Sequence, residues 1–172
     1  LASPLRDVYK RQDVDYVDLR RAISSYASCD VKNIVLGLGS TEILRDAIHY
    51  FAPKTSMILS PCYSEYESEL RKISSYIIEY NLEEKNDFKV NLDELIKTIN
   101  EKNIEFLIFA NPNNPTGTIL KRSEIEKILK ETEATVLVDE TYIEFTDMRT
   151  FSSSSLTKSY DKLIVVRGTS KF

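Results

Sequence analysis

The stretch "FANPNNPTGTIL", Phe109 to Leu120, is the part of the sequence that decides the fold. It joins the end of the apolar run "IEFLIFA" to the charged pattern "RSEIEKILKE", whose apolar positions have helical spacing. A continuous apolar run is typical of a strand covered on both faces of its sheet. Pro112 and Pro115 have fixed φ angles, and Gly117 permits a tight exit. The stretch therefore predicts a buried strand, a rigid polar turn and a helix.

The same alternation continues in both directions along the chain. Further expected strands are the apolar runs "NIVLG", "SMILSP", "SYIIEY", "ATVLVDE" and "KLIVVRG". Amphipathic patterns such as "TEILRDAIHYF" and "NLDELIKTINEK" separate them and predict helices. This order predicts an α/β fold, a three-layer α/β/α arrangement with a mostly parallel sheet. The serine run Ser152–Ser155 predicts a solvated loop.

Composition excludes several classes of function. The 172 residues carry a net charge of -4 at pH 7, which favours neither nucleic acid nor an anionic membrane as a partner. No apolar run approaches the ~18 residues of a membrane-spanning helix. Cys29 and Cys62 have neither metal nor redox spacing and are interpreted as reduced thiols of a cytoplasmic protein. The single His49 excludes multi-histidine metal sites, and we predict no metal.

The two ends of the chain differ from the rest. The segment "LASPLRDVYKRQ", Leu1 to Gln12, has no periodicity and resembles translated vector sequence, so we predict a non-native leader. The other end stops two residues after an apolar run has passed into a polar loop. We therefore interpret residues 13–172 as one domain that is incomplete at its C-terminal side.

Polar residues follow the expected strands. Ligands of parallel sheets bind beyond the carboxyl ends of the strands, and those ends share one edge. The segments that follow the runs are Gly39–Thr41, Pro61–Tyr63, Asn111–Gly117, Asp139–Tyr142 and Arg167–Lys171. Together they offer hydroxyls at a helix start, aromatic rings, an amide, a carboxylate and an amine.

Several of these residues have two readings when each is taken alone. Ser40 and Thr41 at a helix start suit a phosphate group, but they also suit an ordinary N-cap. Asn114 is an amide donor at the mouth of a strand or part of a purely structural turn. Asp139 ends an apolar strand, where a carboxylate needs a partner; a protonated pyridine nitrogen, a helix cap or an ion pair would serve. Lys171 alone is more typical of a surface lysine.

The motifs "NPNNPTG", "VLVDETYIEF" and "SK", in this order, resemble fold-type I pyridoxal-phosphate enzymes of the class I/II aminotransferase group. Within that group the chain is most similar to histidinol-phosphate aminotransferases and threonine-phosphate decarboxylases. The resemblance runs from about Asp13 to Phe172. It implies the N-terminal part of the cofactor-binding large domain, without the C-terminal remainder and the small domain.

The resemblance implies a role for each matching residue. Lys171 looks like the catalytic lysine that binds the cofactor covalently, and Asp139 like the carboxylate that keeps its pyridine nitrogen protonated. Tyr142 and Asn114 would bind its phenolic oxygen, and Tyr63 would stack on its ring. The remaining residues match phosphate-binding positions: Ser40, Thr41 and Ser170.

The sequence departs from the family pattern at two positions and omits others. Gly168 stands where the family often has Ser or Thr, and Leu38 stands where it has a polar residue in "GNG". The arginines that bind the phosphate and the substrate carboxylate would lie beyond Phe172.

The implied function is amino-group transfer between an amino acid, or a phosphorylated amino compound, and a 2-oxo acid. The full-length protein would be a homodimer, and the 172-residue chain alone would be inactive. Two alternatives stay open: threonine-phosphate decarboxylation in corrinoid synthesis, and a non-catalytic sensor module of aminotransferase descent.

Overall fold

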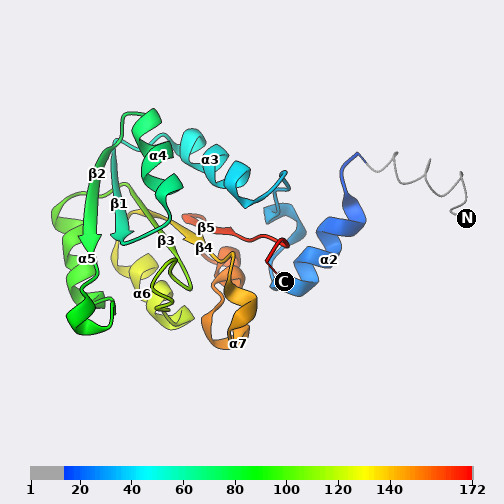
Figure 1. Cartoon of the computed structure of the whole chain (residues 1–172). Coiled ribbons are helices and arrows are strands. Elements are labelled where there is room, and N and C mark those ends of the chain that lie inside the picture. Colours follow the sequence, from blue (N-terminus) through cyan, green and yellow to red (C-terminus); the bar gives the residue numbers. More distant parts are fainter. Residues whose placement is uncertain (1–13, 172) are drawn as a thin grey trace, which may run out of the picture.

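A parallel β-sheet runs through the middle of the computed structural model, which describes residues 14–171 (Figure 1). Its strand order is β2-β1-β3-β4-β5, and every neighbouring pair is parallel. The strands are β1 (Thr55–Ser60), β2 (Tyr76–Asn81), β3 (Phe106–Ala110), β4 (Thr135–Asp139) and β5 (Leu163–Val166). The predicted α/β class and parallel sheet are confirmed.

Helices cover both faces of this sheet, as Figure 1 shows, and make the predicted three layers. One face packs against α3 (Ser40–Phe51) and α4 (Ser64–Lys72), the other against α5 (Leu92–Glu101) and α6 (Arg122–Glu131). The shorter helical segments and the N-terminal helix are α2 (Val17–Ala27), α7 (Met148–Phe151), η1 (Val31–Asn33), η2 (Glu84–Asn86), η3 (Ile143–Phe145) and η4 (Ser154–Lys158).

Strand β3 shows why its sequence is apolar throughout. Leu107 and Phe109 point into the core cluster beneath α5 and α6, whereas Phe106 and Ile108 point into the cluster beneath α3 and α4. All five residues of the strand are buried. Because side chains alternate between the faces, a strand covered on both sides needs apolar residues at every position.

The strand order creates a crevice at one place on the sheet edge. The chain first adds β2 on one side of β1 and then returns to add β3 on the other side. Loops leaving β1 and β3 therefore turn to opposite faces, and ligands of open α/β sheets bind at such a switch point. The segments carrying Tyr63 and Asn114 leave the sheet here.

One expected strand is absent. Residues 34–37, within "NIVLG", are irregular, and Val35 is 79% exposed. The run is paired with no strand of the described sheet, and without a neighbour an apolar run cannot complete its backbone hydrogen bonds as a strand. Gly39, Ser40 and Thr41 instead reach the carboxyl edge at the start of α3.

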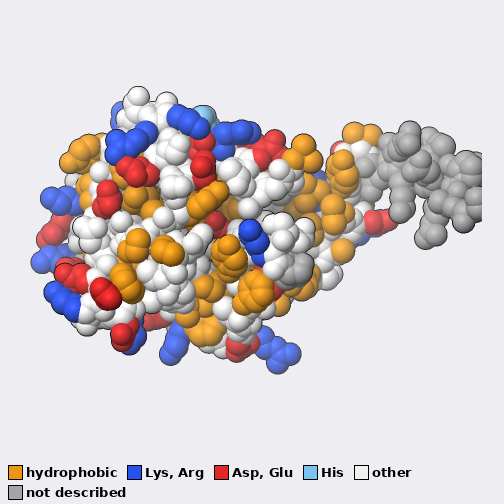
Figure 2. Space-filling model, in the orientation of Figure 1, with side chains coloured by type: hydrophobic (Ala, Val, Ile, Leu, Met, Phe, Trp, Pro, Cys, Tyr) orange, Lys and Arg blue, Asp and Glu red, His pale blue; other side chains and the backbone are white. Residues whose placement is uncertain are grey.

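Other findings concern residues 14–171 as a whole. Within this range no helix has the length and apolar character needed to cross a bilayer, and no group of His, Cys, Asp and Glu side chains could hold a metal. Charges of both signs are interspersed on the face drawn in Figure 2. The predicted leader, Leu1 to Gln12, lies outside the described residues.

Candidate active site

A cavity of about 280 Å³ opens at the carboxyl edge of the sheet. It lies between the ends of β3 and β4, the start of α3 and the start of α4. Every site residue expected from the sequence borders it: Ser40, Thr41, Tyr63, Asn114, Asp139, Tyr142, Ser170 and Lys171. Four further residues complete the lining: Gly39, Tyr66, Ala110 and Thr141.

The start of α3 presents backbone donors to this cavity. Gly39 occupies the N-cap position with φ of 99°, a left-handed value that favours glycine, and no side chain caps the helix. The first N–H groups of a helix have no partner within the helix. With the hydroxyls of Ser40 and Thr41 beside them, they make an anion-binding group.

Asp139 supplies a carboxylate to the cavity from the end of β4. It lies two residues after Leu137 and therefore faces the same side of the sheet, toward α4. Tyr66 donates from its Oη to Asp139 Oδ2 at 2.8 Å, and Thr141 donates to Oδ1 from its N at 3.0 Å and its Oγ1 at 2.5 Å. Asp139 is only 8% exposed and makes no ion pair with any residue in 14–171.

Two tyrosines one helical turn apart form an aromatic wall. The ring of Tyr63 stands edge-on to the ring of Tyr66, with centroids 5.7 Å apart and an interplanar angle of 88°. Tyr63 is half-buried, whereas Tyr66 is fully buried. The ring of Tyr63 is therefore the one that a flat ligand could contact.

The asparagines of the "NPNNPTG" turn serve different purposes. Asn111 donates from its Nδ2 to the Leu120 carbonyl at 3.0 Å and accepts from the Leu120 N–H at 2.8 Å, which closes the turn. Asn113 donates to the Pro61 carbonyl and so ties the turn to the segment after β1. Asn114 is half-buried at the cavity, and its side chain makes no hydrogen bond within the described part of the chain.

Tyr142 and Lys171 also border the cavity. Lys171 is exposed, and its Nζ lies 6.0 Å from the centroid of the Tyr142 ring. Within residues 14–171 this amine makes no ion pair. An amine, a phenol and a carboxylate thus border one space, although they come from two different strand ends.

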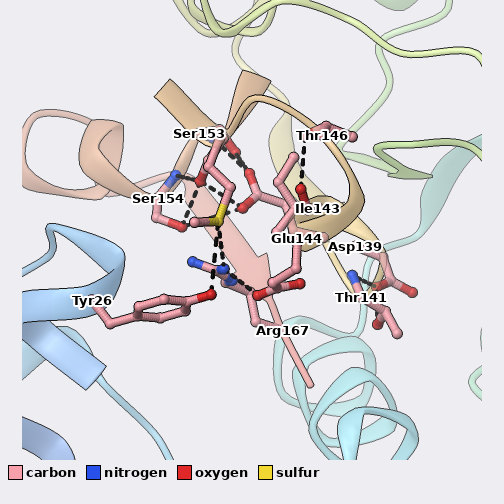
Figure 3. A network of polar contacts seen from close by, with 12 residues as sticks. Tyr26, Asp139, Thr141, Ile143, Glu144, Thr146, Ser153, Ser154 and Arg167 are labelled. Atoms are coloured by element: carbon pink, nitrogen blue, oxygen red, sulfur yellow. Dashed lines mark hydrogen bonds and ion pairs between the residues drawn. The ribbon is translucent and has the colours of Figure 1, made fainter. Parts of the chain in front are cut away.

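Glu140 is not among the residues that line the cavity, and its carboxylate instead lies in a cage of three serines, two of which, Ser153 and Ser154, are labelled in Figure 3. It accepts hydrogen bonds from Ser152 Oγ at 2.7 Å, from Ser153 N and Oγ at 2.5 and 2.8 Å, and from Ser154 Oγ at 3.3 Å. Burial raises the pKa of the Glu140 carboxyl, and the serine donors oppose that rise. The expectation of a solvated serine loop was wrong, because Ser153 and Ser154 are buried around this carboxylate.

A partly buried ion pair lies beside this cage. Glu144 binds the guanidinium of Arg167, which also lies 5.0 Å from the ring centroid of Tyr26 in α2 (Figure 3). The pair joins the segment after β4 to the segment after β5. These are the segments that carry Tyr142 and Lys171.

Sequence reasoning missed Tyr66, Thr141 and Glu140. A signal for Tyr66 was present, because it follows Tyr63 by three residues in a helical pattern and so faces the same direction. The serine run likewise contains the hydrogen-bond donors for Glu140. A local pattern, however, does not reveal that these serines donate to a carboxylate from another segment of the chain.

A family model for aminotransferase class I and II matches residues 5–172. The chain belongs to the class I and II aminotransferase family. Two curated relatives of this family are similar over most of the chain. A protein of Caldanaerobacter subterraneus subsp. tengcongensis, provisionally named a threonine-phosphate decarboxylase, is 38% identical over 96% of this chain. The histidinol-phosphate aminotransferase of Clostridium novyi is 37% identical over 92% of it.

A solved structure of the family has the same architecture. The histidinol-phosphate aminotransferase of Clostridium acetobutylicum superimposes with a TM-score of 0.79 at 28% identity, over 93% of this chain and 47% of that one. This chain likewise covers 46% and 44% of the two curated relatives. It therefore spans about half the length of these class I and II aminotransferase relatives.

Proposed function

We propose that this chain is the cofactor-binding part of a longer pyridoxal-phosphate enzyme that transfers amino groups to and from a 2-oxo acid. The observation that carries the proposal is the set of groups around one cavity. The amine of Lys171, the buried carboxylate of Asp139 and the uncapped helix start at Ser40 all border it. Similarity to a histidinol-phosphate aminotransferase supports the reaction class.

The residues present fit the cofactor. A buried carboxylate needs a cationic or hydrogen-bonding partner, and a protonated ring nitrogen would complete the set around Asp139. The first turn of α3 suits the phosphate group, helped by Ser40, Thr41 and Ser170. The half-buried ring of Tyr63 offers a surface for stacking.

Pyridoxal phosphate, when bound, supplies an electron sink for the α-carbon of an amino acid. The chain supplies the other functions. Lys171 would hold the cofactor covalently and move a proton to and from the substrate α-carbon through its Nζ. Asp139 would hold a proton on the ring nitrogen, and Tyr142 and Asn114 would donate to the phenolic oxygen.

A second candidate is the decarboxylation of threonine phosphate. The relative from Caldanaerobacter favours it, as does a solved L-threonine-O-3-phosphate decarboxylase from Porphyromonas gingivalis, with a TM-score of 0.73 at 26% identity. The cavity residues serve either reaction, because both begin at the same α-carbon. A non-catalytic sensor module is disfavoured, since it would need neither Lys171 nor Asp139 beside the cavity.

We further propose a cytoplasmic homodimer for the full-length protein. The dimer is supported by family membership alone. Size-exclusion chromatography with light scattering would test it, and a monomer at micromolar concentration would contradict it.

The lysine assignment is tested with the full-length protein and Lys171→Ala. We expect the wild type to absorb visible light when loaded with the cofactor and to keep a cofactor label on Lys171 after borohydride reduction, as mass spectrometry would show. Lys171→Ala should lose both signals, whereas Lys97→Ala in α5, on the opposite layer, should keep them. A reducible covalent adduct in the Lys171 variant would contradict the assignment.

The two reactions are then separated by product. Histidinol phosphate with 2-oxoglutarate should yield glutamate if the first proposal is right, and threonine phosphate should release carbon dioxide if the second is. Activity with neither substrate, in a protein that binds the cofactor at Lys171, would leave the cofactor proposal standing and overturn both substrate proposals.

A further inference from the structure

Tyr66 is a fully buried tyrosine whose hydroxyl reaches a carboxylate that borders the cavity. It lies in the first turn of α4, and its Oη donates to Asp139 Oδ2 at 2.8 Å. Its ring supports Tyr63 edge-on. One side chain therefore contacts both the ring that we expect to stack on the cofactor and the acid that we expect to face its nitrogen.

The other oxygen of Asp139 is also held. Thr141 donates to Oδ1 through both its N and its Oγ1, so the carboxylate accepts three hydrogen bonds from neutral groups. Donors of this kind stabilise the charged form of a carboxylate, which burial alone would disfavour. They also fix the plane of the carboxylate and hence the direction of its remaining lone pairs.

The Tyr66 hydroxyl carries its proton and can therefore act as a hydrogen-bond donor. Burial and the neighbouring Asp139 carboxylate raise the pKa of the Tyr66 phenol far above its ordinary value, so the group stays protonated. A protonated phenol between an apolar helix layer and an anion has one favourable orientation, with its hydrogen toward the anion.

We propose that Tyr66, together with Thr141, is a positioning residue that keeps the Asp139 carboxylate aimed at the cofactor's ring nitrogen. The inference rests on the proposed function. It differs from a purely structural role, in which the Tyr66 hydroxyl would only tie α4 to β4. A structural bond would support every ligand of the cavity equally, whereas positioning of Asp139 matters only to a ligand with a protonated ring nitrogen.

The test compares two ligands on full-length apoprotein by equilibrium titration. One ligand is pyridoxal phosphate, and the other is its carba analogue, in which C–H replaces the ring nitrogen. We expect Tyr66→Phe to raise the dissociation constant of pyridoxal phosphate roughly tenfold, which is the scale of a hydrogen bond to a charged group. The dissociation constant of the carba analogue should rise by less than about twofold. Tyr80→Phe is the matched control, since Tyr80 also donates to a carboxylate, Glu94 at 3.1 Å, but packs against the opposite core cluster.

The outcomes separate the two proposals. Equal losses for both ligands in Tyr66→Phe, or no loss for either, would overturn the positioning role while the cofactor proposal stands. Failure of the wild type to bind pyridoxal phosphate would overturn the proposed function itself. If Tyr66→Phe does not fold, Thr141→Val removes the hydroxyl donor on the other oxygen, and the same selective loss is expected; equal losses there would overturn the role.

Discussion

Among single residues, the end of β4 and the segment after it carry three carboxylates that are anchored in three different ways. Asp139 faces the cavity, Glu140 faces the serine cage, and Glu144 pairs with Arg167. A segment held on alternate sides has little freedom to rotate. Tyr142, which lies between two of these anchors, is therefore held at the cavity by its neighbours in sequence.

The caged Glu140 gives a pH-dependent prediction. Because the folded protein raises the pKa of this carboxyl, the folded state binds the proton more tightly than the unfolded state does. The contribution of Glu140 to stability is therefore fully present below its unfolded pKa and is lost as pH rises through its folded pKa. We expect the free energy of unfolding of the wild type, relative to Glu140→Gln, to fall by up to about 1.4 kcal/mol per pH unit in that window.

Urea unfolding of both proteins from acid to neutral pH would measure this difference. Gln keeps one oxygen for the Ser153 N–H, and the serine hydroxyls can rotate to accept from its amide, so the variant is a fair reference. A difference that grows with pH would show that the cage holds the carboxylate as a favoured anion and would contradict the prediction.

Gly168 leads to a prediction about phosphate binding. A Cβ at this position would meet Ser40 Oγ at 3.6 Å, an ordinary contact, and the backbone there is not in the left-handed region. Gly168→Ser should therefore fit and add a hydroxyl near Ser40 at the phosphate end of the cavity. We expect the full-length apoprotein to bind pyridoxal phosphate about threefold to tenfold more tightly, with Gly168→Ala as the control for chain stiffening. Equal gains in both variants would contradict the phosphate contact.

At the scale of elements, α2 is attached to the body differently from the other long helices. Helix α2 projects from the side of the domain in Figure 1, and Ala27 is its only buried residue. Its attachments are polar: Arg20 donates to the Ile34 carbonyl at 2.9 Å, and Tyr26 lies against Arg167. An element held by few apolar contacts opens at low free energy.

Hydrogen exchange should reveal this difference. We expect the amides of α2 to exchange at least roughly a hundredfold faster than those of β3, all of whose residues are buried. Removing the aromatic contact with Tyr26→Ala should raise exchange in α2 further and leave β3 unchanged. Comparable protection of the α2 and β3 amides from exchange would indicate that another part of the protein packs over α2, and it would contradict the prediction.

At the scale of the whole molecule, the sheet register brings the site together. Ala110 of β3 pairs with Asp139 of β4, and Asp139 pairs with Val166 of β5, so these strands end at one line. The residues after that line come from segments far apart in the chain. The cavity therefore depends on the sheet as a unit and is lost if any central strand unfolds.

The 172-residue chain should not catalyse transamination by itself. It covers less than half of the two curated relatives, and within residues 14–171 strand β5 has a neighbour on one side only. An open edge strand invites pairing with other chains. We expect the purified chain to show no glutamate formation and to self-associate, as light scattering would detect; measurable turnover would contradict this.

Local sequence patterns predict the alternation of strands and helices, apart from the run "NIVLG", and the positions at which polar residues leave the strands. Apolar periodicity is local, and parallel strands end at a common edge, so both could be predicted without coordinates. Six of the eight expected site residues follow or end strands and border the cavity for this reason, whereas Ser40 and Thr41 reach it from the start of α3. Their roles toward a cofactor remain predictions.

The tertiary structure was needed to show which polar groups have hydrogen-bond partners within the protein and which are left at the cavity. It showed that Asn111 closes the turn whereas Asn114 is left at the cavity, and that the serine run surrounds Glu140. It also showed that "NIVLG" finds no strand partner and that Tyr66 donates to Asp139. Each of these depends on a hydrogen-bond partner from a distant segment, and the free energy of a buried polar group is set by that partner rather than by its neighbours in sequence.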